Sequence, residues 1–432
     1  MLLGLLSTAL FSLGCEGPSS EGDAGPEADS GRIVDAGDED AGPDVDSGGV
    51  VPVDIPEGEV YETRGRLSIA DRDTPTARVW DLDVRGEVTT YEVGSGSVLY
   101  SASSRQITAV VATQPSVGFD VFGVGVWVWD HVEHFHVYKD PSVIQVDDML
   151  AHRGNVTDVH VNGGWVVAFD DTTGTTTALF ERSIGPLRTD VARSRAVIFR
   201  TVEGAPHDGL AVVARGHLFT TRADGGIDRY EPTSDGFGDP VFLNCAAPGA
   251  AEASGFRAVF DCADGFLVVR WDATAEAFEE LRVPRAEGME RPSRMIGEDD
   301  LTTFVGLVGD RTIVFVDTDA GAATSVELDD AVLDMEIDRD AGHLLVLTET
   351  GSLVDLDPVT GAELGTLALG ASSTLYDVAV GDGFAYVSEP DAGLVHEVDL
   401  SDLTATGPLE VGGTPAHLVV TALWPGGEPV MH

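Results

Sequence analysis

Lysine is almost absent from this chain of 432 residues, in which Lys139 is the only one. Lysine and arginine number 25 against 74 acidic residues, giving a formal net charge of −49 at pH 7. Residues 16–59 hold fourteen acidic residues and one arginine, which leaves about −36 for the rest of the chain. Nucleic acids and anionic lipid surfaces are recognised through cationic patches. The charge argues against both as partners and permits a basic partner or a cation as ligand.

The common catalytic motifs are also missing. The chain contains no G-x-S-x-G elbow, no P-loop and no H-E-x-x-H pair. Carboxylates are so numerous that a proposed general acid and base would be an arbitrary choice among them. We therefore assign no catalytic residue and predict that the protein is not an enzyme.

A long apolar run is lacking, but the first fourteen residues, "MLLGLLSTALFSLG", form a short one that ends at Cys15. This length is too short to span a bilayer and suits the apolar region of a secretory signal. A small residue followed by cysteine resembles the lipobox of bacterial lipoproteins. We predict a signal peptide over residues 1–14 and a lipid on Cys15, which would be the only membrane contact. A short apolar N-terminus with a chance cysteine is the alternative.

Aromatic residues are absent from residues 15–59, where glycine, proline, serine and aspartate dominate and "DAG" occurs at Asp23, Asp35 and Asp40. Such a segment buries too little apolar surface to offset its ordering entropy. We predict a disordered acidic tether over residues 15–59.

Cysteine is scarce, with three in the chain. If Cys15 carries lipid, Cys245 and Cys262 remain, and an exported compartment favours a disulfide between them. A pair of free thiols binding a metal is the alternative.

Residues 60–432 lack a convincing amphipathic helix and instead repeat short β-branched runs separated by turns rich in glycine, aspartate and threonine. The clearest units are "HLLVLTETGSLVDLDPVTGAEL" and "FAYVSEPDAGLVHEVDLSDLTAT". Besides a strand near Leu67, equivalent inner strands are predicted to begin near Ile107, Trp165, His217, Ala258, Thr303, Leu344 and Ala385. Steps of about forty to forty-five residues are typical of an all-β propeller.

The strand count predicts eight blades, or seven if one blade is irregular. The terminal run "AHLVVTALW" lacks a hairpin partner after it and is expected to pair with the segment starting at Arg66. That pairing would close the ring and remove exposed sheet edges. A pair of β-sandwiches is the alternative fold.

The stretch "VWDHVEHFHVYKD" places three of the eleven histidines within six positions. If residues 130–136 continue as a strand, Asp130, His134 and His136 share one face. If the stretch is a loop, His131 can join them. Imidazole and carboxylate ligands suit zinc best, with copper or nickel also acceptable.

Several segments in order resemble the AztD-type periplasmic zinc metallochaperones. They are "VWVWDHVEHFHV", "APHDGLAVV", "CAAPGAAEASGFRAVFDCADGFLVV", "FVGLVGDRTIVFVD" and "YDVAVGDGFAYVSEPDAGLVHEVDL". The family is made of β-propellers that bind zinc in the periplasm and deliver it to the solute-binding protein of a zinc importer. The resemblance implies a ligand set on this chain and a disulfide between its two later cysteines. The implied residues are His131, His134, His136 and His207 as ligands, Asp130 and Asp208 as supporting carboxylates, and Cys245 with Cys262.

Two positions depart from the family pattern. Ala250, ahead of Glu252, stands where the family has a histidine, and Val161, next to His160, stands where it has another. We predict a zinc-binding envelope lipoprotein, periplasmic or anchored to the outer membrane, whose affinity falls below about pH 6.5 as its histidines protonate. The alternatives are a metal-independent scaffold for a protein or polysaccharide partner and a lactonase-like hydrolase using calcium and histidine.

Overall fold

The computed structural model separates the chain into two compact units, Met1–Gly49 and Val50–His432. It describes residues 58–60, 63–94, 96–101, 107–112, 118–130, 135–139, 145–150, 156–180, 199–234, 236–299, 301–338, 342–370, 375–381 and 383–421. All of these belong to the second unit. The predicted signal peptide and Cys15 lie outside the described residues, as does the predicted tether except for its last two positions.

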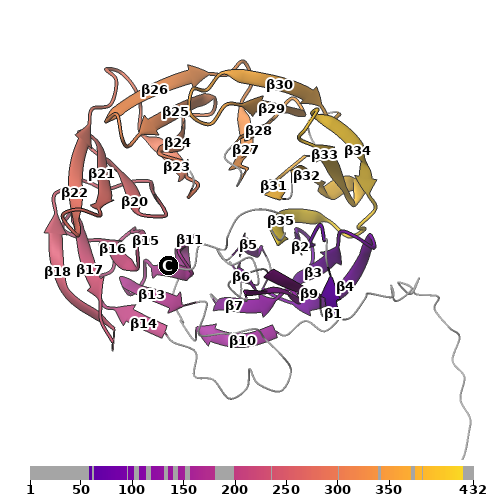
Figure 1. Cartoon of the computed structure of the whole chain (residues 1–432), viewed down its shortest axis with the longest axis horizontal. Helices are drawn as coiled ribbons and strands as arrows, with labels where there is room; N and C mark the ends of the chain where they lie inside the picture. The colour runs from indigo at the N-terminus through magenta and orange to yellow at the C-terminus, as the bar shows by residue number, and fades with distance from the viewer. Residues whose placement is uncertain are drawn as a thin grey trace, which may run out of the picture. The chain divides into compact units, whose positions relative to one another are not determined.

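The second unit is a ring of antiparallel sheets (Figure 1). The described residues contain eight four-stranded sheets and one three-stranded sheet. In each four-stranded sheet the strands lie side by side from the axis outward, as in a propeller blade. The predicted propeller is confirmed, while the number of blades stays a prediction.

The strands fall into four positions by their distance from the axis (Figure 1). The innermost strands are β5 (Val98–Ser101), β11 (Val156–Asn162), β15 (Ala211–Ala214), β19 (Ala251–Ser254), β23 (Pro292–Ile296), β27 (Val332–Ile337), β31 (Val378–Gly381) and β35 (Pro415–Thr421). The second strands are β6 (Ile107–Ala112), β12 (Trp165–Asp170), β16 (His217–Thr221), β20 (Arg257–Cys262), β24 (Thr303–Val308), β28 (Leu344–Thr348), β32 (Phe384–Glu389) and β2 (Arg66–Asp71). The third strands are β7 (Gly118–Gly123), β13 (Thr175–Phe180), β17 (Ile227–Pro232), β21 (Gly265–Asp272), β25 (Thr312–Asp317), β29 (Ser352–Leu356), β33 (Leu394–Asp399) and β3 (Thr76–Asp81). The outer strands are β10 (Gln145–Leu150), β14 (Phe199–Val202), β18 (Phe237–Leu243), β22 (Ala277–Val283), β26 (Ala322–Glu327), β30 (Glu363–Ala368), β34 (Thr404–Leu409) and β4 (Gly86–Glu92).

The strands predicted as inner are the second strands of their sheets, so that expectation is wrong by one position. Strands β2, β12 and β28 are buried throughout. Second strands are covered on both faces by the neighbouring sheets, and several of them, such as β12 and β28, are nearly continuous apolar runs. Four innermost strands, β5, β15, β19 and β31, have only four residues, and others, such as β11 and β27, mix polar with apolar residues. Both features made them harder to recognise. In outer strands such as β26 and β30, exposed residues are interspersed with partly buried ones.

The two ends of the propeller meet in one sheet, as predicted. Strand β35 pairs antiparallel with β2, with Arg66 opposite Thr421 and Leu67 opposite Val420. This pairing lets the last strand of the chain supply the innermost strand of the first blade. The ring therefore has no open edge at this junction.

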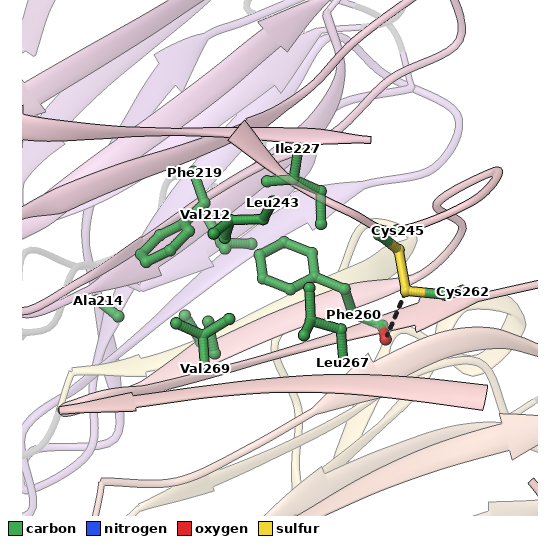
Figure 2. Close-up of a cluster of buried hydrophobic side chains, with 12 residues drawn as sticks. Val212, Ala214, Phe219, Ile227, Leu243, Cys245, Phe260, Cys262, Leu267 and Val269 are labelled. Carbon is green, nitrogen blue, oxygen red and sulfur yellow. Dashed lines mark hydrogen bonds between the residues drawn. A yellow bond between two sulfur atoms is a disulfide. The ribbon is translucent and has the colours of Figure 1, made fainter. Parts of the chain in front are cut away.

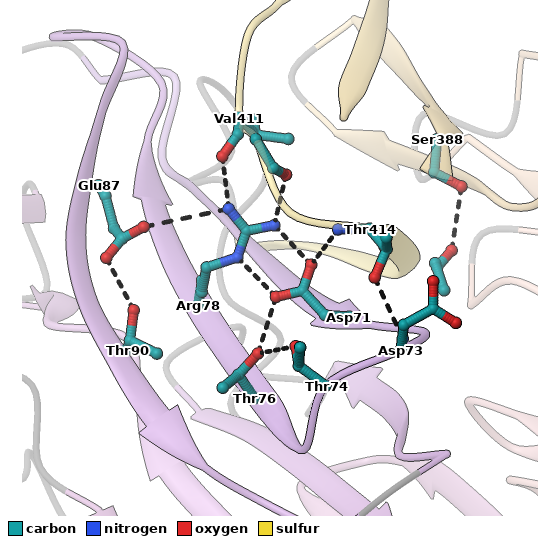
Figure 3. Close-up of polar contacts among 12 residues, drawn as sticks. Asp71, Asp73, Thr74, Thr76, Arg78, Glu87, Thr90, Ser388, Val411 and Thr414 are labelled. Atoms are coloured by element: carbon teal, nitrogen blue, oxygen red, sulfur yellow. Dashed lines mark hydrogen bonds and ion pairs between the residues drawn. The ribbon is translucent and has the colours of Figure 1, made fainter. Parts of the chain in front are cut away.

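Buried ion pairs hold this junction together (Figure 3). The Arg78 guanidinium donates to Asp71 from Nε (2.9 Å) and Nη2 (2.7 Å), and to the carbonyl of Gly412 (3.0 Å). Asp71 also accepts the backbone N–H of Thr414 at 2.9 Å. Deeper in the sheet, Arg66 Nε lies 3.3 Å from Asp81 Oδ2 with neither side chain exposed. We call these four charged residues, Arg66, Asp71, Arg78 and Asp81, the closing seam.

The repeated acidic turns connect third strands to outer strands. In each, an aspartate at the end of the third strand accepts backbone N–H groups two or three residues further on. The aspartates are Asp81, Asp272, Asp317, Asp357 and Asp399. The fourth residue after Asp317 and Asp357 has positive φ, at Gly321 (65°) and Gly361 (70°). This Asx-turn geometry explains the recurring D-x-x-x-G pattern.

Apolar cores fill the space between neighbouring sheets. Figure 2 shows one of them, where Phe219 and Leu243 of one blade face Phe260 and Leu267 of the next. Cys245 and Cys262, both fully buried, form a disulfide at the edge of this core with a Cα–Cα distance of 5.2 Å. The predicted disulfide is present, and it covalently joins two blades.

The histidine-rich stretch does not run as one strand. Strands β8 (Val126–Asp130) and β9 (Phe135–Lys139) form a hairpin, and β1 (Gly58–Val60) pairs with the far edge of β9. Gly58 and Glu59 therefore belong to this sheet, although both were predicted in the tether. Among the described residues the only helix is the short 3-10 helix η4 (Pro390–Ala392), and none is long and apolar enough to cross a membrane.

Candidate functional site

Polar side chains gather where the innermost strands face the propeller axis. Neighbouring innermost strands lie against one another around the ring, and their charged groups interact across several blades. Glu252 of β19, for example, interacts electrostatically with Asp158 of β11, Arg294 of β23 and Glu336 of β27. We call this set the axial cluster. It comprises Tyr100, Asp158, His160, Glu252, Arg294, Asp334, Glu336, Asp377 and His417.

The closest histidine–carboxylate contact of this cluster joins His160 and Glu252. The Nδ1 atom of His160 lies 3.2 Å from Oε1 of Glu252. On the other side of the imidazole, Nε2 of His160 lies 3.1 Å from the backbone carbonyl of Ala253. A carbonyl oxygen only accepts hydrogen bonds, so Nε2 carries the hydrogen and Nδ1 faces Glu252.

His160 Nδ1 and Glu252 Oε1 would both be hydrogen-bond acceptors if the histidine were neutral and the carboxyl group ionised. Burial lowers the pKa of His160 to about 4, so its ring is neutral at pH 7 and Nδ1 presents a lone pair. Burial, reinforced by the nearby Asp158 carboxylate, raises the pKa of Glu252 well above its usual range. The raised pKa favours the acid form of the carboxyl group, whose O–H is a donor for that lone pair. Its Oε1 also accepts the backbone N–H of Ala253 at 3.1 Å. Neutral imidazole and carboxylate are both ligand types that zinc accepts.

Strand β15 explains how β11 reaches β19 across the blade that separates them. Its sequence, "AVVA", has small side chains and spans four residues. Asn162, two residues after His160, donates from Nδ2 to the carbonyl of Val213 at 2.8 Å and accepts the N–H of Gly255 at 3.2 Å. These bonds fix the two strands at the separation at which His160 meets Glu252.

The remaining carboxylates tie innermost strands together through backbone bonds. Asp158 accepts the N–H of Ala211 at 3.2 Å, Asp334 that of Val378 at 2.9 Å, and Asp377 that of Leu418 at 2.7 Å. Each bond joins the innermost strand of one blade, or the residue just before it, to the next.

Burial raises the pKa values of several of these groups. The pKa of Asp158 rises to about 6 and that of Asp377 to about 6, in each case chiefly because surrounding protein desolvates the carboxylate. Glu336 keeps 44% of its side chain exposed, yet desolvation raises its pKa to about 8. The Glu336 carboxyl group is therefore in contact with water while densely surrounded by protein. Five carboxyl groups share this space with one arginine, so the cluster favours protons or added cations.

The sequence-predicted ligands are only partly located. His131 and His134 lie outside the described residues. Asp130 and His136 lie on β8 and β9, where the register pairs Asp130 with Phe135 and His136 with Trp129. The register does not pair Asp130 with His136, and residues 130–136 are divided between β8 and β9 instead of forming the single strand considered above; the loop alternative falls on residues outside the described ones. The three-stranded sheet that carries them is separate from the blades of the axial cluster.

His207 lies in the connection between β14 and β15, half-buried against Phe169. Its Nδ1 lies 2.8 Å from the carbonyl of Ala205 and its Nε2 lies 3.0 Å from Oγ1 of Thr221. The carbonyl fixes the hydrogen on Nδ1, so Nε2 accepts from the threonine hydroxyl. The neighbouring Asp208 is exposed. His207 is thus bonded to its own loop and to a second strand, not to the axial cluster.

From the sequence, His160 and Glu252 were named only as neighbours of Val161 and Ala250. In the structure, the residues next to the two departures from the family pattern form the contact at the axis. Within the described residues no three histidine, cysteine or acidic side chains are close enough to hold one metal ion together. His160 and Glu252 are therefore a pair of metal-ligating residue types, without a third beside them in the described part of the chain.

Comparison of the sequence with models of protein families finds no match. Among solved structures, the chain is similar to AztD from Citrobacter koseri, with 21% identity, a TM-score of 0.69, and coverage of 83% of this chain and 98% of that one. The apo form of that protein gives 20% identity at the same TM-score and coverage. The dihydro-heme d1 dehydrogenase NirN gives 13% identity and a TM-score of 0.57, covering 85% and 78% of the two chains. At these identities the likeness shows a common propeller fold.

Proposed function

We propose that this propeller binds a divalent cation, zinc by resemblance to the metallochaperones, between His160 and Glu252, and carries it as cargo in the cell envelope. The observation that supports the proposal is the 3.2 Å separation of His160 Nδ1 and Glu252 Oε1. With zinc–ligand bonds of about 2.0–2.2 Å, two ligands of a tetrahedral site lie about 3.3 Å apart. The pair therefore needs little movement to exchange its proton for zinc.

The electrostatics of the axial cluster support a cation at the same place. Five carboxyl groups face one guanidinium, and burial raises the pKa values of four of those carboxyl groups. Burial raises the free energy needed to ionise a carboxylic acid, and a bound dication lowers it again. Because His160 is neutral above about pH 4, we expect the loss of affinity on acidification to follow the carboxyl group rather than the imidazole. This revises the sequence-based expectation that histidine protonation sets the limit.

The experiment is a zinc competition titration of the full-length chain against a chromophoric chelator at pH 7.5. Replacing both ligands, as His160→Ala with Glu252→Gln, should weaken binding at least a hundredfold. The matched control is His396→Ala, which removes a histidine 2.8 Å from Glu389, on a third strand away from the axis. That control should bind like the wild type.

A second double variant, His134→Ala with His136→Ala, tests the hairpin. The family resemblance makes this segment a candidate second site, used for capture. If the His134→Ala/His136→Ala variant loses zinc binding and the His160→Ala/Glu252→Gln variant retains it, the assignment of the site to the axis is wrong. If the wild type does not bind zinc at micromolar concentration, the proposed cargo is wrong.

Export, anchoring and delivery belong to the same proposal. A lipid on Cys15 would hold the propeller at a membrane, and zinc would pass to the solute-binding protein of an importer. Replacing Cys15 by alanine should then release the mature protein from the membrane fraction with no change in zinc affinity. This proposal assigns no catalytic residue.

A further inference from the structure

A pocket of about 360 Å³ lies between the blade of β19–β22 and the blade of β23–β26, which follow one another in the ring (Figure 1). Its walls come from the turn between β19 and β20, the end of β21, strand β22 and the turn between β25 and β26. Its lining includes Phe256, Arg257, Arg270, Trp271, Asp272 and Asp319. None of these residues belongs to the axial cluster, and the volume is within the usual range of small-molecule sites.

The repeated Asx-turns place carboxyl groups at this pocket. Asp317 ends β25 and accepts the backbone N–H of Asp319 at 2.9 Å, which fixes the turn that carries the Asp319 carboxylate. Asp272 has the equivalent position in the neighbouring blade. Its Oδ1 accepts the backbone N–H groups of Thr274 at 2.7 Å and Ala275 at 3.1 Å. Each blade therefore contributes one carboxyl group from a turn of fixed shape.

Two arginines approach Asp319 without binding it closely. Arg257 Nη2 and Arg270 Nη1 each lie 3.5 Å from Asp319 Oδ1, which is long for a hydrogen bond. Arg270 is held by shorter bonds, from Nε to Glu279 at 3.1 Å and from Nη1 to the carbonyl of Thr318 at 3.0 Å. Among the described residues, Asp319 is the only hydrogen-bond partner of the Arg257 guanidinium, whose buried Nε has none. Arg257 therefore has donors to offer to a ligand.

The aromatic residues of the pocket are held in position by the protein. The guanidinium carbon of Arg215 lies 4.2 Å from the ring centroid of Trp271, and Phe278 packs edge-on against the same ring at 5.2 Å. Trp271 also donates its backbone N–H to the carbonyl of Phe256 at 3.0 Å. Fixed aromatic side chains give a pocket an apolar surface at little cost in conformational entropy.

We propose that this pocket binds a sugar unit that carries one carboxylate, as a uronic acid does. Arg257 pairs with that carboxylate, because a guanidinium binds a carboxylate through two parallel hydrogen bonds. Asp272 and Asp319 accept hydrogen bonds from hydroxyl groups, and the aromatic residues contact the C–H face of the sugar ring. A ligand with several negative charges is disfavoured, since acidic side chains line the same pocket. The inference goes beyond the proposed cation site and does not rest on it.

The test is isothermal titration calorimetry of the full-length chain with glucuronate, glucose and acetate, in EDTA so that no metal ion contributes. Glucuronate should bind at least about tenfold more tightly than glucose, which lacks the charged hydrogen-bond acceptor. Acetate, which lacks the ring, should also bind at least about tenfold more weakly than glucuronate. Arg257→Met should remove the advantage of glucuronate over glucose. The matched control is Arg311→Met, at the opposite end of β25, whose exposed pair with Asp310 lies outside the pocket; it should bind like the wild type.

Asp319→Asn tests the same site while keeping both arginines. The Asp319 side chain is 56% exposed, so the change leaves the core intact and removes the carboxylate that competes for Arg257. This variant should bind glucuronate about threefold more tightly than the wild type, and it decides the question if Arg257→Met unfolds. Equal affinities for glucuronate and glucose, no gain in Asp319→Asn, or no binding of glucuronate at millimolar concentration would each overturn the inference. None of these results bears on the zinc titration.

Discussion

The closing seam and the axial cluster both place carboxyl groups inside the propeller, yet their charges are balanced differently. In the seam, Asp71 and Asp81 each face an arginine, at 2.7 Å and 3.3 Å. In the axial cluster, five carboxyl groups share Arg294. A carboxylate that is paired inside the protein stabilises the fold only while its partner is present. Carboxyl groups in excess instead retain protons, which a metal ion can displace. The seam is therefore structural, and we propose that the axial cluster binds a cation.

The largest expected effect comes from removing an arginine of the closing seam. Arg78→Met would leave the Asp71 carboxylate buried with no guanidinium, which costs about 3–5 kcal/mol of unfolding free energy. Urea unfolding followed by circular dichroism measures this loss. Arg72→Met is the matched control, because its pairs with Asp73 and Asp391 are exposed, and it should unfold with the wild type. Equal midpoints for the two variants would remove the distinction between the seam and the surface.

The disulfide lies outside both regions and should affect stability alone. Its cysteines are 17 residues apart in sequence, and opening a loop of that size costs about 3 kcal/mol in the chain-entropy model. We expect the double variant Cys245→Ala/Cys262→Ala to melt at a lower temperature with an unchanged zinc dissociation constant. A large change in that constant would show that the core between these blades positions the axial site.

The excess acid of the axial cluster predicts a pH dependence that the seam does not share. Glu336 has a pKa of about 8 in the folded protein, against about 4.3 in an unfolded chain. Its contribution to stability is therefore complete below about pH 4 and is lost as the pH rises to about 8. Glu336→Gln keeps the neutral form, so it should match the wild type at pH 5 and melt at a higher temperature at pH 9. Because 44% of the side chain is exposed, solvent screening reduces the size of this gap.

Melting curves at the two pH values measure this gap, with Glu363→Gln on the outer strand β30 as the matched control. A gap that is equal at pH 5 and pH 9 would mean that Glu336 is not held in its acid form by the cluster.

The smallest effect is expected at His207. His207→Ala removes the bonds to Ala205 and Thr221, which costs about 1 kcal/mol of unfolding free energy. Zinc affinity should stay within about twofold of the wild type, because these bonds lie away from the axial cluster. A fall as large as that of the His160→Ala/Glu252→Gln variant would restore His207 as a ligand and contradict the separation described here.

The fold was accessible from the sequence because its signals are local. Several buried second strands are nearly continuous apolar runs, and the Asp317 and Asp357 turns repeat the same hydrogen bonds at the same spacing. The closure by β35 followed from one strand without a hairpin partner. Several innermost strands were missed because they have only four residues or mix apolar residues with polar ones.

The candidate site could not be read in the same way. His160 and Glu252 are 92 positions apart, and the four-residue strand β15, which lies between β11 and β19, lets them approach. A usable signal did exist, since Asp158 and His160, like Asp334 and Glu336, alternate with apolar residues on short strands. The cluster of histidines at 131–136 drew attention instead because those residues are adjacent in sequence. Of these histidines only His136 lies among the described residues, on β9.

The most direct test of the axial site is an anomalous difference map at the zinc edge, from crystals of the full-length protein grown with one equivalent of zinc. The account predicts a peak between Nδ1 of His160 and Oε1 of Glu252, about 2.0–2.2 Å from each atom. A peak at the β8–β9 hairpin with none at the axis, or no peak at all, would contradict it.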